Sequence, residues 1–255
     1  MELNILNVDD KDYYDGKLYK VSLWNGMGYR TYEYLVYAGG EQEALELAVV
    51  YAERKDDPVL FDYWEIIPGQ GDYYNPDFIT SDGNTHQEKG YLTNIITDKS
   101  LEWLENGRDK DKPFCLMIHH KAVHRNWLPE MKYIREYEDR TFVLPDNFHD
   151  DYQGRIAASR QEMTIAGDMD IVYDTKIFTE DADTRLTGAY KYFISRLDSV
   201  ERKIYDGFYD SLAVDFNSRR LTGKELAEFK YQRYMRDYAK VVKSLDDNVG
   251  RVLDY

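Results

Sequence analysis

The stretch KPFCLMIHHKAVHR, residues 112–125, carries the strongest fold signal in the sequence. After Pro113, residues 114–118 form a continuous apolar run that is bounded by polar residues on both sides. A run of this length is typical of a strand that is buried on both faces in a parallel sheet. Residues 119–129 then form the loop at the carboxyl end of this strand, which is where open α/β sheets bind ligands.

Helical periodicity surrounds this predicted strand. Residues 91–106 carry apolar side chains at helical spacing and are followed by Gly107, which predicts a left-handed helix stop. Helices are also predicted over 155–166 and much of 190–216, and Thr222-Gly223-Lys224-Glu225 matches a capping box that opens one long helix to the end of the sequence. A helix that leads into a buried strand indicates an α/β domain over residues 58–255.

Residues 1–57 have a different texture and predict a small β-β-α module of unknown role. Strands are expected over 17–24 and 29–37, and Asn25-Gly26 between them is a hairpin signal. An amphipathic helix is expected over 41–54, with acidic residues in its first turn. Asp56-Asp57-Pro58 marks the boundary between the two domains.

Composition excludes several classes of protein. The 255 residues hold 33 Lys and Arg against 48 Asp and Glu, a net charge of −15, which argues against nucleic-acid binding and against binding to an anionic membrane. One cysteine excludes an intramolecular disulfide and a Cys-rich zinc site. No apolar run approaches the roughly 20 residues that span a bilayer, and the first residues lack a signal-peptide pattern. We therefore expect a soluble chain that stays in the compartment where it is made.

The candidate functional residues cluster in the loop after the predicted strand. His119, His120, Lys121, His124 and Arg125 place three of the five histidines and two cations together in an acidic protein. Such a loop favours binding of an anion, and a histidine there could deliver a proton to a leaving group. The alternative is a solvated basic loop. The i, i+4 spacing of His120 and His124 matches zinc helices, but the metalloprotease Glu is missing and a strand precedes, so we expect no zinc.

Other side chains support chemistry less well. Cys115 lies inside the apolar run, so we expect a buried structural thiol. Paired acids recur along the sequence, as expected from composition, and none predicts a metal site. Several aromatic side chains could stack on a sugar ring, although core packing is the better interpretation of Trp64 and Trp103. These aromatic residues are Trp64, Tyr73, Tyr74, Trp103 and Trp127.

Five stretches give the chain a family resemblance. They are FDYWEIIPGQG (61–71), YYNPDF (73–78), GYLTNIITD (90–98), residues 112–125, and SLDDNVGR (244–251). Together they resemble the sulfatase family, and most closely the bacterial branch that removes 6-O-sulfate from N-acetylglucosamine in host glycans. The resemblance extends from about residue 58 to the end of the sequence.

The resemblance implies a fold, a reaction and a set of residues. The implied fold is a fragment of an alkaline-phosphatase-like α/β sandwich, and the implied reaction is hydrolysis of a sulfate ester on a carbohydrate. In this family a cysteine converted to formylglycine attacks sulfur beside a bound calcium ion. The family's Ala-Pro-His motif maps onto Ala122-Val123-His124, which makes His124 the catalytic candidate. Lys121, Arg125 and His120 are then the candidates for binding the anionic substrate.

The sequence also departs from the family. It contains no Cys-x-Pro/Ala-x-Arg nucleophile motif, and Val123 replaces the usual proline. The similarity of Asn4–Asp10 to the family's first metal-binding strand is attributed to chance, and the second metal-binding segment would follow the last helix. We therefore expect no calcium bound by this chain and no sulfatase activity from this chain alone. Family members are usually periplasmic or secreted, although no signal peptide is visible here.

Three functional hypotheses remain open at this stage. The chain is a sulfatase fragment, a non-catalytic anion- or partner-binding protein derived from a sulfatase, or a phosphoesterase of the same superfold. Residues 61–71 favour a sulfatase over a phosphoesterase. A fragment without its central strands should aggregate or melt without cooperativity, whereas a selected binding protein should unfold cooperatively.

Overall fold

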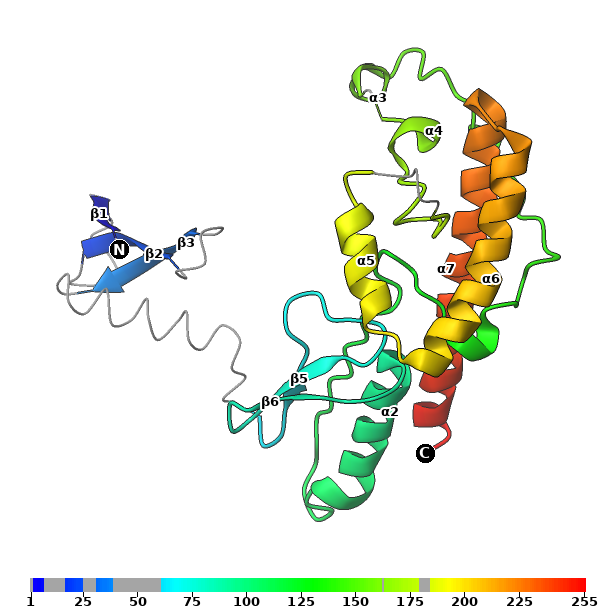
Figure 1. The fold of residues 1–255 in the computed structure, drawn as a ribbon. Helices are drawn as coiled ribbons and strands as arrows, with labels where there is room; N and C mark the ends of the chain where they lie inside the picture. The colour runs from blue at the N-terminus through cyan, green and yellow to red at the C-terminus, as the bar shows by residue number, and fades with distance from the viewer. Residues whose placement is uncertain (1, 7–16, 25–30, 39–60, 162, 179–183) are drawn as a thin grey trace. The chain divides into compact units, whose positions relative to one another are not determined.

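The computed structural model describes residues 2–6, 17–24, 31–38, 61–161, 163–178 and 184–255. The chain divides into two compact units (Figure 1). The first comprises Met1–Glu65 with Thr80–Asn84, and the second comprises Ile66–Ile79 with Thr85–Tyr255.

The amino-terminal sheet is antiparallel and has three strands. β1 (Glu2–Leu6) pairs with β2 (Lys17–Trp24), which pairs with β3 (Thr31–Ala38). Lys17 lies opposite Ala38 and Trp24 lies opposite Thr31. The two predicted strands are thus confirmed, and β1 adds a third. The helix predicted over 41–54 lies outside the described residues, and the domain boundary at residues 57 and 58 stays a prediction.

A second small sheet has the strand order β4-β5-β6. β5 (Asp77–Thr80) and β6 (Thr85–Gln87) form an antiparallel pair in which Asp77 lies opposite Gln87. β4 (Glu65–Ile66) is the third and shortest strand of this sheet.

The predicted helix over 91–106 is confirmed, but its ending differs from the prediction. α2 (Leu92–Glu102) continues into a π turn, η1 (Trp103–Gly107). Gly107 is not among the glycines with a positive φ, so it is not a left-handed stop. A Cβ atom at this position would lie 2.6 Å from Cδ1 of Trp103. The glycine is therefore required by the close approach of the indole ring.

Residues 114–118 do not form the predicted buried strand. These residues have no strand assignment, and no described strand pairs with them. Phe114 is 52% exposed, Met117 is 57% exposed, and the Cys115 thiol is exposed rather than buried. A parallel strand is stable only when neighbouring strands satisfy its backbone on both sides. Both sheets in the described residues are instead small and antiparallel.

The other regular elements described in the second unit are helices, joined by long irregular segments. After the short helix η2 they are α3, α4, α5, α6 and α7. Their bounds are η2 (Met131–Tyr133), α3 (Ile156–Arg160), α4 (Ile165–Asp168), α5 (Thr187–Ser195), α6 (Ser199–Arg219) and α7 (Gly223–Leu253). α6 and α7 run antiparallel side by side, and the carboxyl end of α7 lies beside α2 (Figure 1).

The long terminal helix is confirmed, but its predicted cap is not. Thr222 precedes α7 without a side-chain capping hydrogen bond. The capping box is found instead at the start of α6, where the Asp198 carboxylate accepts from the backbone of Glu201 and the Glu201 side chain accepts in return. The helix predicted over 155–166 is divided between α3 and α4.

The main hydrophobic core lies where α5, α6 and α7 meet the segments around residues 73, 91 and 172. Its buried hydrophobic side chains are Tyr73, Tyr74, Tyr91, Leu128, Ile134, Val172, Tyr190, Phe193, Ile194, Leu197, Tyr205, Phe208, Tyr209 and Val241. Six of these residues are tyrosines with buried rings, so the phenol hydroxyls need polar partners inside the core.

A buried ion network lies beside this core. The carboxylate of Asp237 on α7 lies 3.1 Å from Lys176, 2.9 Å from Arg233 and 3.2 Å from Lys240. Glu138 is the second carboxylate of the network and pairs with Arg233 and Lys240. Burial opposes ionisation of Asp237, but the three cations outweigh it and hold the pKa of Asp237 well below its usual range.

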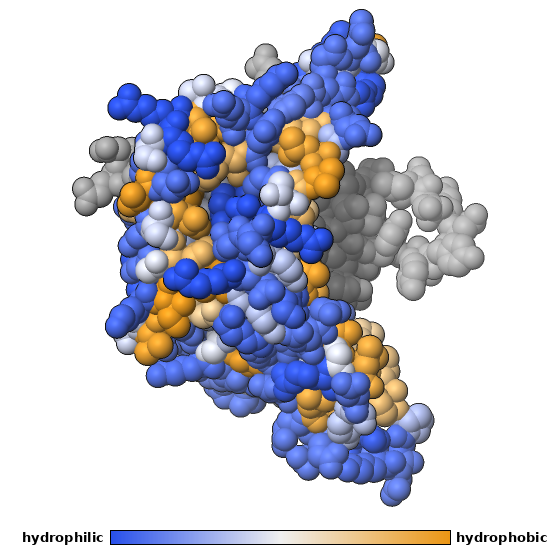
Figure 2. Space-filling view, turned by 90° about the vertical axis from the view of Figure 1, so that its right-hand side faces the viewer, coloured by the Kyte–Doolittle hydropathy of each residue, from blue (hydrophilic) through white to orange (hydrophobic). Residues whose placement is uncertain are grey.

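One face of the molecule is hydrophilic over much of its area (Figure 2). In the face shown in Figure 2, hydrophilic residues predominate and hydrophobic residues form separate patches. None of the described helices combines the length and apolar content that crossing a bilayer requires.

Candidate functional site

Three of the four predicted site residues converge on one pocket of about 200 Å³. Lys121, His124 and Arg125 line it from the loop that follows the apolar stretch. The facing wall comes from residues 70–74 and from α5. The remaining lining residues are Gln70, Gly71, Asp72, Tyr73, Tyr74, Asn126, Leu128, Tyr173, Ala189, Tyr192 and Phe193.

The backbone of the loop is fixed around His124. The His124 amide donates to the Lys121 carbonyl at 2.8 Å, and the His124 carbonyl accepts from the Trp127 amide at 3.3 Å. The same carbonyl accepts from the Tyr73 hydroxyl at 2.6 Å. His124 itself is exposed, and because its Nδ1 contacts the Arg125 carbonyl at 2.5 Å, Nε2 is the ring nitrogen that is accessible to a ligand in the pocket.

Lys121 presents a partly buried ammonium group to the pocket. Its Nζ donates to the Gln70 carbonyl at 2.8 Å and lies 5.1 Å from the centre of the Tyr73 ring. Burial lowers the pKa of Lys121, and the negative charge of Asp72 opposes that shift. Because an ammonium has three donors, Lys121 can bind an anion while it keeps its contact with Gln70.

Arg125 is held by a buried carboxylate. Its guanidinium donates twice to Asp174, at 2.6 and 2.7 Å, and lies 5.2 Å from the centre of the Tyr173 ring. The hydrogen bonds to Asp174 raise the pKa of Arg125. Asp174 is 3% exposed, so much of the Arg125 charge balances this carboxylate. The remaining N–H groups of a five-donor guanidinium stay available to a ligand.

A second carboxylate, Asp72, lines the pocket opposite the cations. It accepts from the Tyr192 hydroxyl at 3.1 Å, and its oxygen lies 3.5 Å from Nε of Arg196. The pocket lining therefore combines one acidic side chain, Asp72, with Lys121 and Arg125, and Asp174 balances Arg125 from outside the lining.

His120, the fourth predicted residue, is not among the residues that line this pocket. Its ring Nδ1 is buried and has no hydrogen-bond partner among the described residues. Burial lowers the pKa of His120, which favours the neutral imidazole.

The structure adds partners that sequence reasoning missed. Asp174, Asp72 and Tyr192 are brought to the loop from other segments, and in a sequence with 48 acids nothing distinguishes these two aspartates. Tyr73 and Tyr74, which were candidates for stacking on a sugar, are each only 3% exposed. Their rings belong to the core, and their hydroxyls support the loop.

The residues at this pocket do not fit a calcium ion. Calcium takes six to eight oxygen ligands, with carboxylates prominent among them. Of the two carboxylates at the pocket, Asp174 is already bound to Arg125, and Asp72 faces Arg196 and Tyr192. Two cationic side chains, Lys121 and Arg125, line the same space and would repel a divalent cation.

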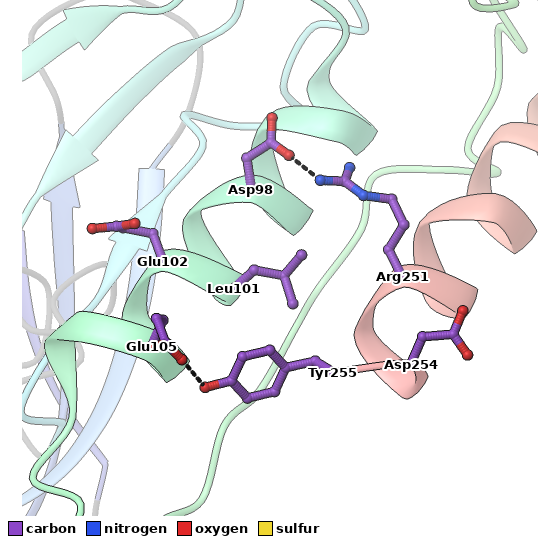
Figure 3. A pocket seen from close by; sticks show the side chains of 7 residues that line it. All are labelled: Asp98, Leu101, Glu102, Glu105, Arg251, Asp254 and Tyr255. Carbon is purple, nitrogen blue, oxygen red and sulfur yellow. Dashed lines mark hydrogen bonds and ion pairs between the residues drawn. The ribbon is translucent and has the colours of Figure 1, made fainter.

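A larger and more open hollow of about 600 Å³ lies between α2 and the carboxyl end of α7 (Figure 3). Arg251 pairs with Asp98 across it, and the Tyr255 hydroxyl donates to Glu105 at 2.7 Å. Its lining contains four carboxylates and one cation, so it does not suit an anionic ligand. None of the four predicted site residues lines it.

Comparison with known proteins gives concordant matches. The family model described as Sulfatase matches residues 21–255, a range that begins inside the predicted β-β-α module. A curated relative, the N-acetylglucosamine-6-O-sulfatase of Bacteroides thetaiotaomicron, is 43% identical over 78% of this chain and 36% of the relative. A protein solved in complex with its substrate D-glucosamine-2-N,6-O-disulfate is 42% identical, with a TM-score of 0.70 over 76% of this chain and 40% of that protein. The chain thus spans well under half the length of either relative.

Proposed function

Because the chain belongs to the sulfatase family, we propose that it supplies part of the active site of a sulfatase that hydrolyses 6-O-sulfate esters of glucosamine-type sugars. One observation carries this proposal. Lys121, His124 and Arg125 meet at one pocket, in a chain that is 43% identical to an N-acetylglucosamine-6-O-sulfatase. We infer that the fold to which these residues belong is of the alkaline-phosphatase-like α/β sandwich type, supported by the match to a solved sulfated-glucosamine complex at a TM-score of 0.70.

Each residue has a proposed role in ester cleavage. When a nucleophile supplied from outside these residues forms a bond to sulfur and the S–O ester bond breaks, the sugar oxygen leaves with the bonding electrons and takes a proton, for which the exposed imidazole of His124 is the donor. The Lys121 ammonium and the free N–H groups of Arg125 bind the sulfate oxygens and stabilise their charge. His120 is the fourth substrate-binding candidate. Because its ring nitrogen is buried and it does not line the pocket, we assign it a supporting role in the loop.

A second function, binding of an anion without catalysis, is favoured by a specific feature of the sequence. There is no Cys-x-Pro/Ala-x-Arg motif to supply the nucleophile, and the pocket does not fit calcium. Without those groups His124 alone cannot supply the required reduction of the barrier. A protein derived from a sulfatase would then keep the affinity of Lys121, His124 and Arg125 for a sulfated sugar.

Calorimetric titration with glucosamine-6-sulfate tests the site that both functions share. We expect binding that is lost with unsulfated glucosamine and weakened in Lys121→Ala and His124→Ala. His149→Ala is the matched control, because His149 pairs with Glu228 at 2.9 Å and does not line the pocket. Equal affinity for the sulfated and unsulfated sugars, or equal effects of His124→Ala and His149→Ala, would contradict the proposal.

A further inference from the structure

Three tyrosines support the functional loop in the same way. Each one donates its hydroxyl to a backbone carbonyl between residues 124 and 129. The pairs are Tyr73 with His124 at 2.6 Å, Tyr74 with Pro129 at 3.0 Å and Tyr91 with Leu128 at 3.1 Å. Tyr74 also accepts from the Met131 amide at 2.6 Å, which ties down the far end of the loop.

The three rings form one buried group. Tyr73 and Tyr74 are 3% exposed and Tyr91 is 4% exposed. The Tyr91 ring lies 5.9 Å from the Tyr73 ring and 5.1 Å from the Tyr74 ring, centre to centre. Burial raises the pKa of all three phenols, so each hydroxyl keeps its proton and remains a donor.

Only one of the three tyrosines contacts the candidate catalytic end of the loop. Tyr73 binds the His124 carbonyl through its hydroxyl, and its ring face lies 5.1 Å from Nζ of Lys121. Tyr74 and Tyr91 bind carbonyls four or five residues further along. One side chain thus contacts both residues to which proton donation and anion binding are assigned.

The sequence around His124 gives this contact particular weight. Residue 123 is valine, which leaves the backbone φ free where a proline would fix it. The His124 ring is held directly by a 2.5 Å contact between its Nδ1 and the Arg125 carbonyl, and the position of its backbone depends on the hydrogen bonds to its own carbonyl. The Tyr73 hydroxyl and the Trp127 amide both donate to its carbonyl.

We propose that Tyr73 is a positioning residue for the sulfated-sugar site, orienting His124 through its hydroxyl and Lys121 through its ring. The proposal rests on the proposed function, because it assumes that His124 and Lys121 bind the ligand. It assigns a specific role to the hydroxyl oxygen, separate from the packing of the ring.

Tyr73→Phe and Tyr91→Phe form a matched pair that tests this role in the full chain. Each substitution keeps a buried ring and removes one hydroxyl that donates to a loop carbonyl, so both should lower the midpoint of urea unfolding similarly. Only Tyr73→Phe should weaken binding of glucosamine-6-sulfate, by about 2- to 10-fold, the factor that corresponds to one ordinary hydrogen bond. Tyr73→Phe should also change the shift that this ligand induces in the His124 Hε1 resonance.

A second measurement needs no ligand. Loss of the Tyr73 hydroxyl should speed amide hydrogen exchange at His124 and Trp127, whereas loss of the Tyr91 hydroxyl should leave exchange at these two amides unchanged. If the wild-type chain does not bind the sugar but Tyr73→Phe alone speeds this exchange, the proposed function fails and the positioning role stands. The proposal is overturned if Tyr73→Phe and Tyr91→Phe have the same exchange rates at these two amides and, where the wild-type chain binds the sugar, the same affinity for it. Tyr73 is then only structural.

Discussion

The carboxylate of Asp174, which is buried in the second unit, is paired with the guanidinium of Arg125, which reaches solvent. The Asp174 side chain is 4% exposed, whereas the Arg125 side chain is 42% exposed. Asp174 also accepts a hydrogen bond from the Asp170 amide at 2.8 Å. A carboxylate in this setting is stable as an anion only while its donors are present. Arg125 therefore stabilises the fold in addition to its proposed role in ligand binding.

Arg125→Ala should destabilise the chain because it leaves the Asp174 charge without its cation. We expect a loss of about 2–3 kcal/mol in the free energy of unfolding, below the 3–5 kcal/mol of fully buried pairs because Arg125 is partly solvated. Urea denaturation measures it. The control is Arg202→Ala, which removes an exposed pair with Asp206 and should cost no more than about 0.5 kcal/mol. A similar cost for both variants would contradict a structural role for Asp174.

Sequence reasoning found the loop residues but not the groups that orient them. Lys121, His124 and Arg125 lie within five positions, so one stretch of sequence identifies all three. Asp174 and Tyr73 lie 49 and 51 positions away from their respective partners, Arg125 and His124. Such pairs arise only from the tertiary fold, and no local pattern indicates which distant side chain will supply the hydrogen bond.

At the scale of the element, α7 is anchored by charge as much as by apolar contact. Three of its residues, Arg233, Asp237 and Lys240, are at most 1% exposed. Asp237 connects α7 to Lys176 and also accepts from the Tyr209 hydroxyl of α6 at 3.1 Å. Lys176 in turn donates to the Asp174 carbonyl at 3.2 Å, so one short segment touches both the ion network and the pocket.

Asp237→Asn should be strongly destabilising because it leaves three buried cations with Glu138 as their one remaining carboxylate in the network. We expect a loss of about 3–5 kcal/mol in the free energy of unfolding, measured by urea or thermal denaturation. Asp246→Asn on the same helix is the control. Asp246 is exposed, so its substitution should stay within about 0.5 kcal/mol.

The same residue predicts how stability depends on pH. The folded pKa of Asp237 is depressed by its three cations, so its contribution is fully present above the unfolded value of about 3.9 and is lost as the pH falls below it. Between pH 5 and pH 3 the wild-type chain should lose more stability than Asp237→Asn, which has no carboxyl to protonate. Equal losses of stability in the two proteins would show that the pKa of Asp237 is not depressed in the folded state.

The apolar segment 114–118 provides the opposite case, an element whose sequence and structure disagree. Phe114 is 52% exposed, although its ring contacts Trp103 and the Arg108 guanidinium. Phe114→Ala should therefore cost less than about 1.5 kcal/mol, whereas Phe208→Ala, at a site 3% exposed, should cost about 3–5 kcal/mol. A comparable loss in Phe114→Ala, measured by the same denaturation, would show that the segment is buried in solution.

The helices could be predicted because their signals are local. The apolar spacing in α2 and α7 repeats every three or four residues, and each repeat lies within the element itself. A buried parallel strand depends instead on neighbours supplied by other parts of a polypeptide. The apolar run at 114–118 is compatible with such a strand, but the run itself does not show whether neighbouring strands are present.

At the scale of the whole molecule, the net charge of −15 contrasts with the local charge of the loop. At the pocket, Asp72 lies in the lining with Lys121 and Arg125, and Asp174 binds Arg125 from outside the lining. The binding of an anion therefore depends on hydrogen-bond donors in fixed positions more than on a general positive field. This dependence is why the orientation of His124 and Lys121 should matter more than the number of cations.

The 255-residue chain carries a candidate proton donor but no recognisable nucleophile motif. We expect no turnover of an aryl sulfate or of glucosamine-6-sulfate above the rate in buffer. The sequence contains no Cys-x-Pro/Ala-x-Arg nucleophile motif, and the carboxylates at the pocket are engaged by cations rather than free for a metal. General acid catalysis alone contributes about 10²–10⁴-fold, far below the acceleration that enzymes typically reach, about 10⁶-fold or more.

Sulfate release measured by ion chromatography, with His124→Ala as the comparison, checks this expectation. Identical background rates for the two proteins would support a role in which the chain binds the sulfated sugar and holds a proton donor beside it. Turnover that disappears in His124→Ala would show that the chain contains a nucleophile that its sequence does not indicate. The search for that nucleophile would then begin at the other residues lining the pocket, where Asp72 is the carboxylate not paired with Arg125.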